Sequence, residues 1–352
     1  MPDEGSAFDG RSDAQKIAFG PLIFQAARML RDMGILACLA DNHRTGVTQS
    51  EIARRTELSN YAVGVLIDNG LAAGLVSERD ERYFITKTGH FILHDPMTRA
   101  NMNFVNDVCY RGMSRLEEAL RESKPAGLSL LGPWSTVYEA LPELPDDVRR
   151  SWYEFDHLYS DAAFDQCLPV VFEGKPARML DVGGNTGRWA LRCLRHSPDV
   201  HVRIMDLPAQ VEGAVTALHA QGFSDRVHGH PIDLLDRSGE FPGGHDVIWM
   251  SQLLDCFGEE DIVSILSRAR AVMDENTRLF ILEPFLDRQR HDAAALCLAA
   301  TSLYFACMAN GAGRMYRCAD LIRLAEHAGL RIAGEFDEMG LAHTLLECRA
   351  GT

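Results

Sequence analysis

The stretch DVGGNTG, residues 181–187, decides how the C-terminal half of this chain folds. A short apolar run at residues 177–180 precedes it, and a helical pattern follows from about Trp189. Strand, glycine turn and helix in this order form a unit in which a ligand approaches the backbone of the turn closely. The stretch therefore predicts a ligand site at the end of a strand in an α/β domain.

An acid, Asp206, ends the next apolar segment, residues 202–205, and Leu207 and Pro208 follow it. A carboxylate at this place accepts hydrogen bonds from the hydroxyl groups of a ribose. The turn lacks the Gly-x-Gly-x-x-Gly spacing that seats a pyrophosphate on a helix N-terminus, and Asp181 would repel phosphate. S-adenosylmethionine is a nucleoside with an ammonium, a sulfonium and no phosphate, so we predict it as the cofactor. The alternative is an ordinary turn with a solvated Asp206.

From residue 176 onward, segments with strand and helix patterns alternate. The expected strands lie near residues 177–182, 201–206, 226–231, 246–251, 278–284, 331–336 and 343–348, and the expected helices near 187–196, 208–221, 259–273, 292–309 and 317–329. Such alternation predicts a mostly parallel sheet covered on both faces, with its ligand at the C-terminal strand ends. The polar residues near these ends are Asp181, Asp206, Asp233, Ser251 and Glu283.

The N-terminal part has the pattern of a winged helix. A helix is expected at residues 14–40, a second begins at Thr48 with Glu51 closing a capping box, a third spans 61–71, and two strands follow near 76–78 and 82–85. The third helix carries no Arg or Lys, which argues against a DNA recognition helix. The apolar stripe of the first helix would be partly exposed in a monomer, so we predict a homodimer. Residues 1–12 are polar, and we expect them to be loose.

Composition narrows the class of protein further. The 352 residues suggest two or three domains, and the formal net charge of −15 argues against nucleic-acid partners. The nine cysteines include no Cys-x-x-Cys pair, so we predict no metal site and a reducing, cytoplasmic location. The longest apolar run, residues 293–309, contains polar residues, and we interpret it as a buried helix and not as a membrane span.

The region between the two patterned parts, residues 91–165, is helical in pattern and rich in aromatic residues. Three of them, Tyr110, Trp134 and Tyr159, are our candidates for lining a pocket for a flat, apolar ligand. The alternative is that these side chains only pack the link between domains.

These pieces together resemble the class I small-molecule O-methyltransferases of bacteria and plants. The resemblance rests on Leu180 with the glycine turn, on residues 206–208 and 232–234, and on the acidic helix start at 258–261, and it covers about residues 14–349. It implies an α/β Rossmann-like methyltransferase domain with a mostly parallel seven-stranded sheet, at residues 171–352. A mostly helical winged-helix dimerisation domain would occupy residues 13–95, and a helical linker that contributes to the substrate pocket would occupy 96–170.

The resemblance also implies roles for single residues. Gly183 would approach the methionine portion of S-adenosylmethionine, Asp206 would hold the ribose, and Asp233 with Leu234 would flank the adenine. We assign the neighbouring strand-end residues to the same cofactor site: Asp181, Gly184, Leu207, Ser251 and Gln252.

The chain departs from the family where the catalytic base is expected. The family has a lysine and, four residues later, a catalytic histidine, and this chain has Ser251 and Asp255 at those positions. Met315 replaces the acid that orients the base. The segments 107–110, 133–139, 155–161 and 251–257 are similar to a narrower bacterial branch, the methyltransferases encoded with aryl-polyene pigment pathways.

The missing histidine leaves the base open. A phenol has a pKa of about 10, roughly 6 units above a free aspartate, so full proton transfer to Asp255 would cost about 8 kcal/mol. Burial of Asp255, a more acidic substrate, or a histidine elsewhere, His157 or His343, would each repair the deficit. The alternative for Asp255 is a cap on the helix that starts near Glu259.

The predicted activity is transfer of a methyl group from S-adenosylmethionine to a hydroxyaryl or polyketide-like small molecule. O-methylation is favoured, and ring C-methylation stays open because a phenolate is also nucleophilic at its ortho carbon. Two alternatives remain: a catalytically inactive relative that binds a ligand, suggested by the missing base, and a winged-helix transcriptional regulator.

Overall fold

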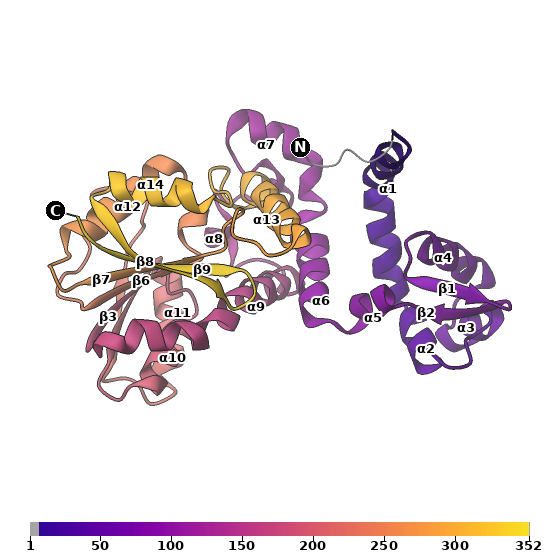
Figure 1. Cartoon of the computed structure of the whole chain (residues 1–352), viewed down its shortest axis with the longest axis horizontal. Helices are drawn as coiled ribbons and strands as arrows, with labels where there is room; N and C mark the ends of the chain where they lie inside the picture. Colours follow the sequence, from indigo (N-terminus) through magenta and orange to yellow (C-terminus); the bar gives the residue numbers. More distant parts are fainter. Residues whose placement is uncertain (1–6, 352) are drawn as a thin grey trace. The chain divides into compact units, whose positions relative to one another are not determined.

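The chain divides after Asn103 into two compact units in the computed structural model, which describes residues 7–351 (Figure 1). Each unit has its own hydrophobic core. The division falls at the end of a helix beyond the predicted winged helix, so the predicted boundary at residues 95 and 96 lies inside the first unit.

The first unit is a helical domain with a two-stranded hairpin. Its elements are α1 (Ala7–Asp32), α2 (Ile35–Asp41), α3 (Gln49–Thr56), α4 (Asn60–Ala72), β1 (Val76–Arg79), β2 (Arg82–Ile85), α5 (Lys87–His94) and α6 (Pro96–Asn103). The predicted capping box starts α3, because the backbone N–H of Glu51 donates to Thr48 Oγ1 and the N–H of Thr48 donates to the Glu51 carboxylate. The helix, turn, helix and hairpin of the winged-helix pattern are all present.

Two expectations for this unit need correction. The helix predicted at residues 14–40 is two helices, because Gly34 adopts a left-handed φ of 80° that ends α1 and caps α2. The segment expected to be loose, residues 1–12, lies partly outside the described residues, and from Ala7 on it is the first turn of α1.

The second unit begins with a helical region. It contains η1 (Phe104–Cys109), η2 (Gly112–Arg115), α7 (Leu116–Glu122), η3 (Ala126–Leu130), α8 (Val137–Ala140), α9 (Asp146–Val171) and η4 (Phe172–Gly174). Aromatic and aliphatic side chains of these elements pack in one cluster with residues of two later elements, α13 (Asp292–Tyr304) and η6 (Phe305–Ala309). The helical region is therefore part of the same unit as the sheet.

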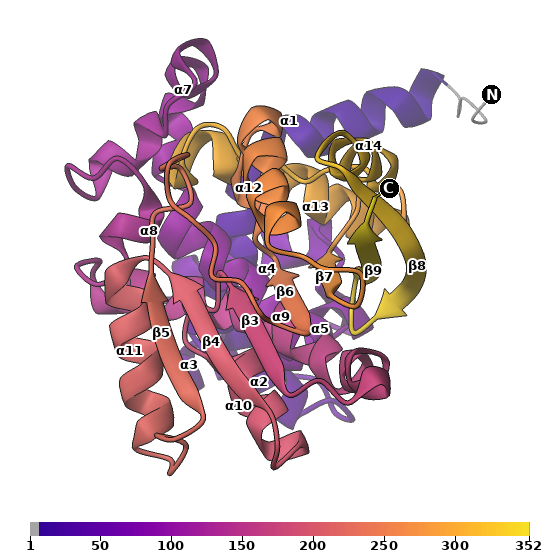
Figure 2. The same cartoon turned by 90° about the vertical axis from the view of Figure 1, so that its left-hand side faces the viewer.

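A seven-stranded sheet forms the centre of the second unit, in the order β5-β4-β3-β6-β7-β9-β8 (Figure 2). The strands are β3 (Arg178–Val182), β4 (His201–Asp206), β5 (Val227–Pro231), β6 (Val247–Ser251), β7 (Arg278–Glu283), β8 (Leu330–Met339) and β9 (His343–Ala350). All neighbours pair in parallel except β9, which is antiparallel to β7 and β8.

Helices cover both faces of this sheet. One core cluster joins the sheet to α12 (Glu259–Ala271) and α14 (Cys318–His327), and a second joins it to α9, α10 (Arg188–His196) and α11 (Pro208–His219). Side chains alternate along a strand, so Leu180 belongs to the first cluster and Met179 to the second. The predicted fold class, a Rossmann-like, mostly parallel sheet with a mostly helical N-terminal domain, is confirmed.

One helical segment, Asp292–Ala309, is long and apolar enough to cross a membrane by length and composition, and a third of it is buried in the fold. Leu298 and Tyr304 are buried and Leu296 is 71% exposed, so the expectation of a buried helix holds for only one face of this segment.

Candidate active site

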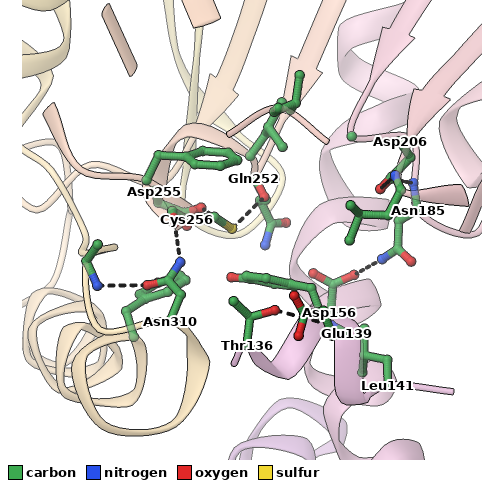
Figure 3. Close-up of a pocket in the computed structure, with 18 of the residues that line it drawn as sticks. Thr136, Glu139, Leu141, Asp156, Asn185, Asp206, Gln252, Asp255, Cys256 and Asn310 are labelled. Carbon is green, nitrogen blue, oxygen red and sulfur yellow. Dashed lines mark hydrogen bonds between the residues drawn. The ribbon is translucent and has the colours of Figure 1, made fainter. Parts of the chain in front are cut away.

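A cavity of about 290 Å³ lies at the C-terminal ends of the parallel strands, within the second unit. Strand-end residues form one part of its wall: Gly183, Asn185, Asp206, Asp233, Gln252 and Asp255. Aromatic side chains form another part: Phe104, Tyr138, Trp152, Phe155, Tyr304 and Phe305. Figure 3 shows Asp255, Cys256 and Asn310 on one side of this space and Asn185 with Asp206 on the other. The cavity joins a polar end at the sheet to an apolar, aromatic end.

The glycine turn after β3 is packed too closely for side chains. A Cβ atom on Gly183, whose φ is +73°, would lie 2.6 Å from Leu253 Cδ1. A Cβ on Gly184 would lie 2.8 Å from Ile204 Cγ2 and 3.0 Å from Asp181 Oδ2. The turn therefore presents bare backbone at the cavity wall, which suits close approach of a ligand.

Two acids flank this turn, Asp181 buried and Asp206 half-buried. Asp206, at the end of β4, accepts the N–H of Asn185 at 2.8 Å and the N–H of Leu207 at 2.7 Å, so its carboxyl is held in place at the cavity wall. Asp181 is 2% exposed, and its Oδ2 atom has no hydrogen-bond partner. Burial raises the pKa of Asp181 to about 8 and also raises the pKa of Asp206. A buried carboxyl with one oxygen free of partners, as in Asp181, fits a cationic ligand.

The remaining cofactor candidates lie around the same strand ends. Leu207, Asp233 and Leu234 line the cavity beyond β4 and β5, and Asp233 Oδ1 accepts the N–H of Leu235 at 2.9 Å. Gln252 lines it beyond β6, with a φ of +46° and a buried Oε1 atom that has no partner. Ser251, one residue earlier, does not line the cavity.

These observations fit S-adenosylmethionine. The bare backbone of the glycine turn suits the methionine part of that ligand. The fixed carboxyl at the end of β4 suits its ribose, and the buried acid with a free oxygen suits its ammonium group. The individual assignments to the cofactor stay predictions.

Asp255 lies in a short turn, η5 (Leu254–Cys256), and is 5% exposed. Burial raises the pKa of Asp255 to about 7, and the Sγ–H of Cys256 donates to its Oδ1 atom at 3.4 Å. The N-cap of α12 is Gly258, which makes no side-chain cap, so Asp255 does not cap that helix. Its carboxyl is therefore buried at the cavity wall and has a pKa close to neutral pH.

Glu283 fixes the turn that carries Asp255. It is 3% exposed, and its Oε1 atom accepts the N–H groups of Leu253 and Leu254 at 2.9 and 2.8 Å. The position of Glu283 at the end of β7 was evident from the sequence, but this role was not, because the partners are separated from it by about thirty residues.

Asp156 on α9 is a cavity residue that the sequence analysis missed. Its Oδ2 atom accepts the side-chain N–H of Asn185 at 3.1 Å. Burial, and after it the charge of Asp255, raise the pKa of Asp156 to about 7. The available signal was an acid inside an aromatic stretch of helix, directly before His157.

The two histidine candidates do not line the cavity, although His157 Nδ1 lies 3.6 Å from Oδ2 of the lining residue Asp156. His157 Nε2 is 3.4 Å from Thr186 Oγ1, and burial lowers the pKa of His157 to about 4. His343, at the start of β9, is 1% exposed with both ring nitrogens unpartnered, and burial lowers its pKa to about 4. Within residues 7–351, neither of them lines the cavity.

The structure also places the three predicted aromatic candidates outside the cavity lining. Tyr110 is 36% exposed, Trp134 packs at the edge of the helical-region core, and the ring of Tyr159 lies 5.1 Å from that of Phe155. Their roles as substrate-binding residues stay predictions, and the aromatic wall comes from other positions in the same region.

The described residues contain no group of three or more His, Cys, Asp or Glu side chains arranged to hold a metal ion.

Comparison with known proteins follows the same division of the chain. A family model described as a Dimerisation2-like domain matches residues 11–83, and one described as an O-methyltransferase domain matches residues 154–331. Among curated proteins, the chain is 24% identical over 304 residues to the L-tyrosine C(3)-methyltransferase of Streptomyces lavendulae, which covers 85% of this chain and 81% of that protein. It is 27% identical over 269 residues to the 3-amino-4-hydroxybenzoate 4-O-methyltransferase of Streptomyces cremeus, covering 75% and 71%.

Solved structures show the same fold. The S-adenosylmethionine-dependent methyltransferase SibL in its apo form has a TM-score of 0.74 at 22% identity, covering 97% of this chain and 99% of that one. The mitomycin 7-O-methyltransferase MmcR has a TM-score of 0.73 at 18% identity, covering 97% and 98%. Because the O-methyltransferase domain matches about half of its length, the chain belongs to the O-methyltransferase domain family and is an S-adenosylmethionine-dependent methyltransferase.

Proposed function

We propose that this methyltransferase acts on a small hydroxyaryl acceptor held in the cavity at the strand ends. One observation carries the proposal: a single cavity is lined by the cofactor candidates, by the buried carboxyl of Asp255 and by a wall of aromatic side chains. That wall is ordered, because the indole N–H of Trp152 donates to the hydroxyl of Tyr304 at 2.6 Å and the rings of Phe104 and Phe155 stack at 3.9 Å. A flat aromatic ring fits such a surface.

The strand-end residues would hold the cofactor. When bound, S-adenosylmethionine supplies an electrophilic methyl group on a positively charged sulfur. Asp206 would accept hydrogen bonds from the ribose with the lone pairs that its two backbone partners leave free, and Asp233 with Leu234 would border the adenine. Asp181 would balance positive charge beside Gly183 and Gly184. Holding both reactants in one cavity is itself a large part of the catalysis of a displacement reaction.

Asp255 would accept the acceptor's hydroxyl proton. A free aspartate lies roughly 6 pKa units below a phenol, which is too weak a base. With the pKa of Asp255 raised to about 7, the gap narrows to roughly 3 units, or about 4 kcal/mol. The raised pKa thus supports a carboxylate as the base in the place where the family has a histidine. Asp255 is favoured over His157 and His343 because it lines the cavity and they do not, and because burial lowers the pKa of both histidines to about 4.

Oxygen is the expected site of methylation, and the ring carbon ortho to the hydroxyl is a second candidate. The similarity to a protein named L-tyrosine C(3)-methyltransferase, over 85% of this chain, favours this second candidate. Loss of the phenolic proton raises the nucleophilicity of both atoms, so the same base serves either reaction, and the pose of the ring decides between them.

We further propose that the protein is a homodimer in the cytoplasm. Support for the dimer comes from the Dimerisation2-like domain at residues 11–83 and from apolar side chains on α1 that are more than half exposed, namely Ile17, Phe19 and Leu22. All nine cysteines are free thiols, which suits a reducing compartment. A monomeric mass by light scattering would contradict the dimer.

Binding and turnover test the proposed function together. S-adenosylhomocysteine should bind in a calorimetric titration, and Asp206→Asn should weaken that binding about tenfold, since a charged hydrogen-bond acceptor is lost. Phenolic acceptors should then yield methylated products with S-adenosylmethionine, and nuclear magnetic resonance of the product identifies the methylated atom. Binding without turnover of any phenol would favour the catalytically inactive alternative.

A further inference from the structure

The ionisable side chains in the cavity wall are all acids. Six carboxyl groups line it, on Glu139, Asp156, Asp206, Asp233, Asp255 and Asp261, and no Lys, Arg or His of the described chain does so. One of the six is neutralised from outside the cavity, because Arg237 pairs with Asp261 at 3.0 Å. The cofactor brings two positive charges and one carboxylate, so an excess of negative charge remains after it binds.

Three of these carboxyls belong to the acceptor's part of the cavity. Glu139 extends from α8 and Asp156 from α9, beside the aromatic residues of the helical region, and Asp255 enters from another wall (Figure 3). Glu139 is exposed, and its Oε2 atom accepts the backbone N–H of Ser135 at 3.3 Å, which leaves its other oxygen for a ligand.

The charge of Arg188 acts on Asp156, but that guanidinium pairs with Asp161 and lies outside the cavity lining. His157 Nδ1 lies 3.6 Å from Asp156 Oδ2, but burial lowers the pKa of His157 to about 4, so this ring is uncharged at neutral pH. The three carboxyls therefore face the cavity without a cation on its wall.

Unsatisfied polar atoms point to the same kind of ligand. Two lining residues next to these carboxyls have a buried oxygen with no hydrogen-bond partner: Asn185, whose side-chain N–H donates to Asp156, and Tyr138, which precedes Glu139. The amide oxygen of Asn185 only accepts hydrogen bonds, and the hydroxyl oxygen of Tyr138 also accepts them. A buried acceptor without a donor is costly, and a ligand that donates several hydrogen bonds removes that cost.

We infer that the acceptor carries a protonated amine and no free carboxylate, with its ammonium group held by Asp156 and Glu139 and its hydroxyl group directed toward Asp255. This inference rests on the proposed function and narrows its substrate class from hydroxyaryl compounds to amine-bearing phenols. An ammonium donates three hydrogen bonds to these acceptors, whereas a carboxylate would be repelled by the acids and would find no cation in the lining.

The titration of the carboxyls supports this assignment. Burial raises the pKa values of Asp156 and Asp255 to about 7, and the charge of Asp255 adds to the shift of Asp156, so both groups are partly protonated at neutral pH. A cation beside them lowers these pKa values. Binding of an amine-bearing phenol should therefore release protons to the buffer, and binding of a neutral phenol of the same size should not.

A charge series on one scaffold tests the inference. The probes are 4-(2-aminoethyl)phenol, 4-(2-hydroxyethyl)phenol and 4-hydroxyphenylacetate, which are cationic, neutral and anionic phenols of similar length. With saturating S-adenosylhomocysteine, calorimetry should give the cation at least about tenfold tighter binding than the neutral phenol, and the anion the weakest binding. Titrations of the cation in buffers with different ionisation enthalpies should show proton release.

Two variants on one helix provide the control. Asp156→Asn should reduce the preference for the cation over the neutral phenol about tenfold while binding of the neutral phenol stays within a factor of about two or three. Glu154→Gln makes the same change of charge at an exposed position of α9 outside the cavity and should keep the preference.

The outcomes separate the inference from the proposed function. Equal or tighter binding of the neutral or anionic phenol overturns the inference and leaves phenol methylation standing. If S-adenosylhomocysteine binds and none of the three phenols does, the hydroxyaryl function fails and the inference fails with it. Loss of preference in Glu154→Gln as well would overturn the assignment of the ammonium to the cavity.

Discussion

Replacing Asp255 with asparagine isolates the proposed base. The amide has nearly the shape of the carboxyl, so the turn held by Glu283 and the cavity wall should stay as they are. Because the side chain is only 5% exposed, ionised Asp255 carries an energetic cost of desolvation, and the neutral amide does not. Folding should therefore not be harmed, and the change falls on proton transfer.

The expected loss follows from the pKa values. A phenol with a pKa of about 10 faces a base with a pKa of about 7, and the remaining gap of roughly 3 units costs about 4 kcal/mol. A positioned general base typically contributes about a hundred- to ten-thousandfold to the rate. The pKa of Asp255 is lower than that of the phenol, so its contribution should lie at the lower end of this range. We therefore expect Asp255→Asn to lower kcat about a hundredfold for an ordinary phenol.

The assay compares two acceptors. A nitrophenol that is already ionised at neutral pH needs no base, so Asp255→Asn should methylate it at nearly the wild-type rate while an ordinary phenol loses about a hundredfold. For the ordinary phenol, the wild-type rate should rise with pH through about 7 as Asp255 loses its proton, and this rise should flatten in the variant.

Two results would refute this reasoning. Equal losses for both acceptors would mean that Asp255 positions the substrate and does not take its proton. An unchanged rate for the ordinary phenol would mean that the base lies elsewhere, and His157→Gln would then be the next variant. Thermal unfolding and affinity for S-adenosylhomocysteine serve as controls, and both should match the wild type.

Other parts of the fold yield three further predictions. Gly313→Ala places a Cβ 2.5 Å from the backbone oxygen of Asp255, so it should shift the catalytic turn and lower both the melting temperature and kcat, as measured by calorimetry and initial rates. Arg278→Met removes a guanidinium that pairs with Glu347 at 2.9 Å and donates to the backbone oxygens of Val170 and Val171. Arg349 still pairs with Glu347 at 3.1 Å, but the two carbonyls lose their donor, so the change should cost about 3 kcal/mol in urea unfolding; a loss under about 1 kcal/mol would contradict this. Burial raises the pKa of Asp181 to about 8, so the folded protein keeps a proton that the unfolded chain loses above about 4, and stability falls as pH rises through this window. The difference in unfolding free energy between wild type and Asp181→Asn should therefore widen from about pH 5 to about pH 8, and a constant difference would disprove the shift.

Most of the sheet was predictable because each strand carries its own local signal. The apolar runs at β3, β4, β6 and β7 end in polar residues, and every predicted strand from 177–182 to 343–348 corresponds to an observed one within a few residues. The capping box at Thr48 was equally local. The break at Gly34 was missed because a single glycine within an apolar periodic stretch interrupts the pattern too briefly to show.

The aromatic wall of the cavity was not predictable in the same way. Which aromatic side chains of residues 91–165 face the cavity depends on contacts with α13 and η6, which lie far along the chain. Trp152 faces it and is fixed by Tyr304, whereas Trp134, chosen from the same stretch, packs elsewhere. Local spacing places residues on one face of a helix, but it does not say what that face will meet.

The identity of the base illustrates a deeper limit of sequence. Read alone, an aspartate in place of a histidine signals a lost function, because the ordinary pKa of a carboxyl is too low to take a phenolic proton. The structure changes this conclusion, since the same side chain at 5% exposure, with Asp156 as a second acid in the cavity wall, has a pKa of about 7. Burying two acids costs stability in the free protein, and a cationic ligand offsets that cost. Under the proposed assignments, a single arrangement of carboxyls would supply the base, favour a cofactor with positive charges and select for an acceptor with an amine.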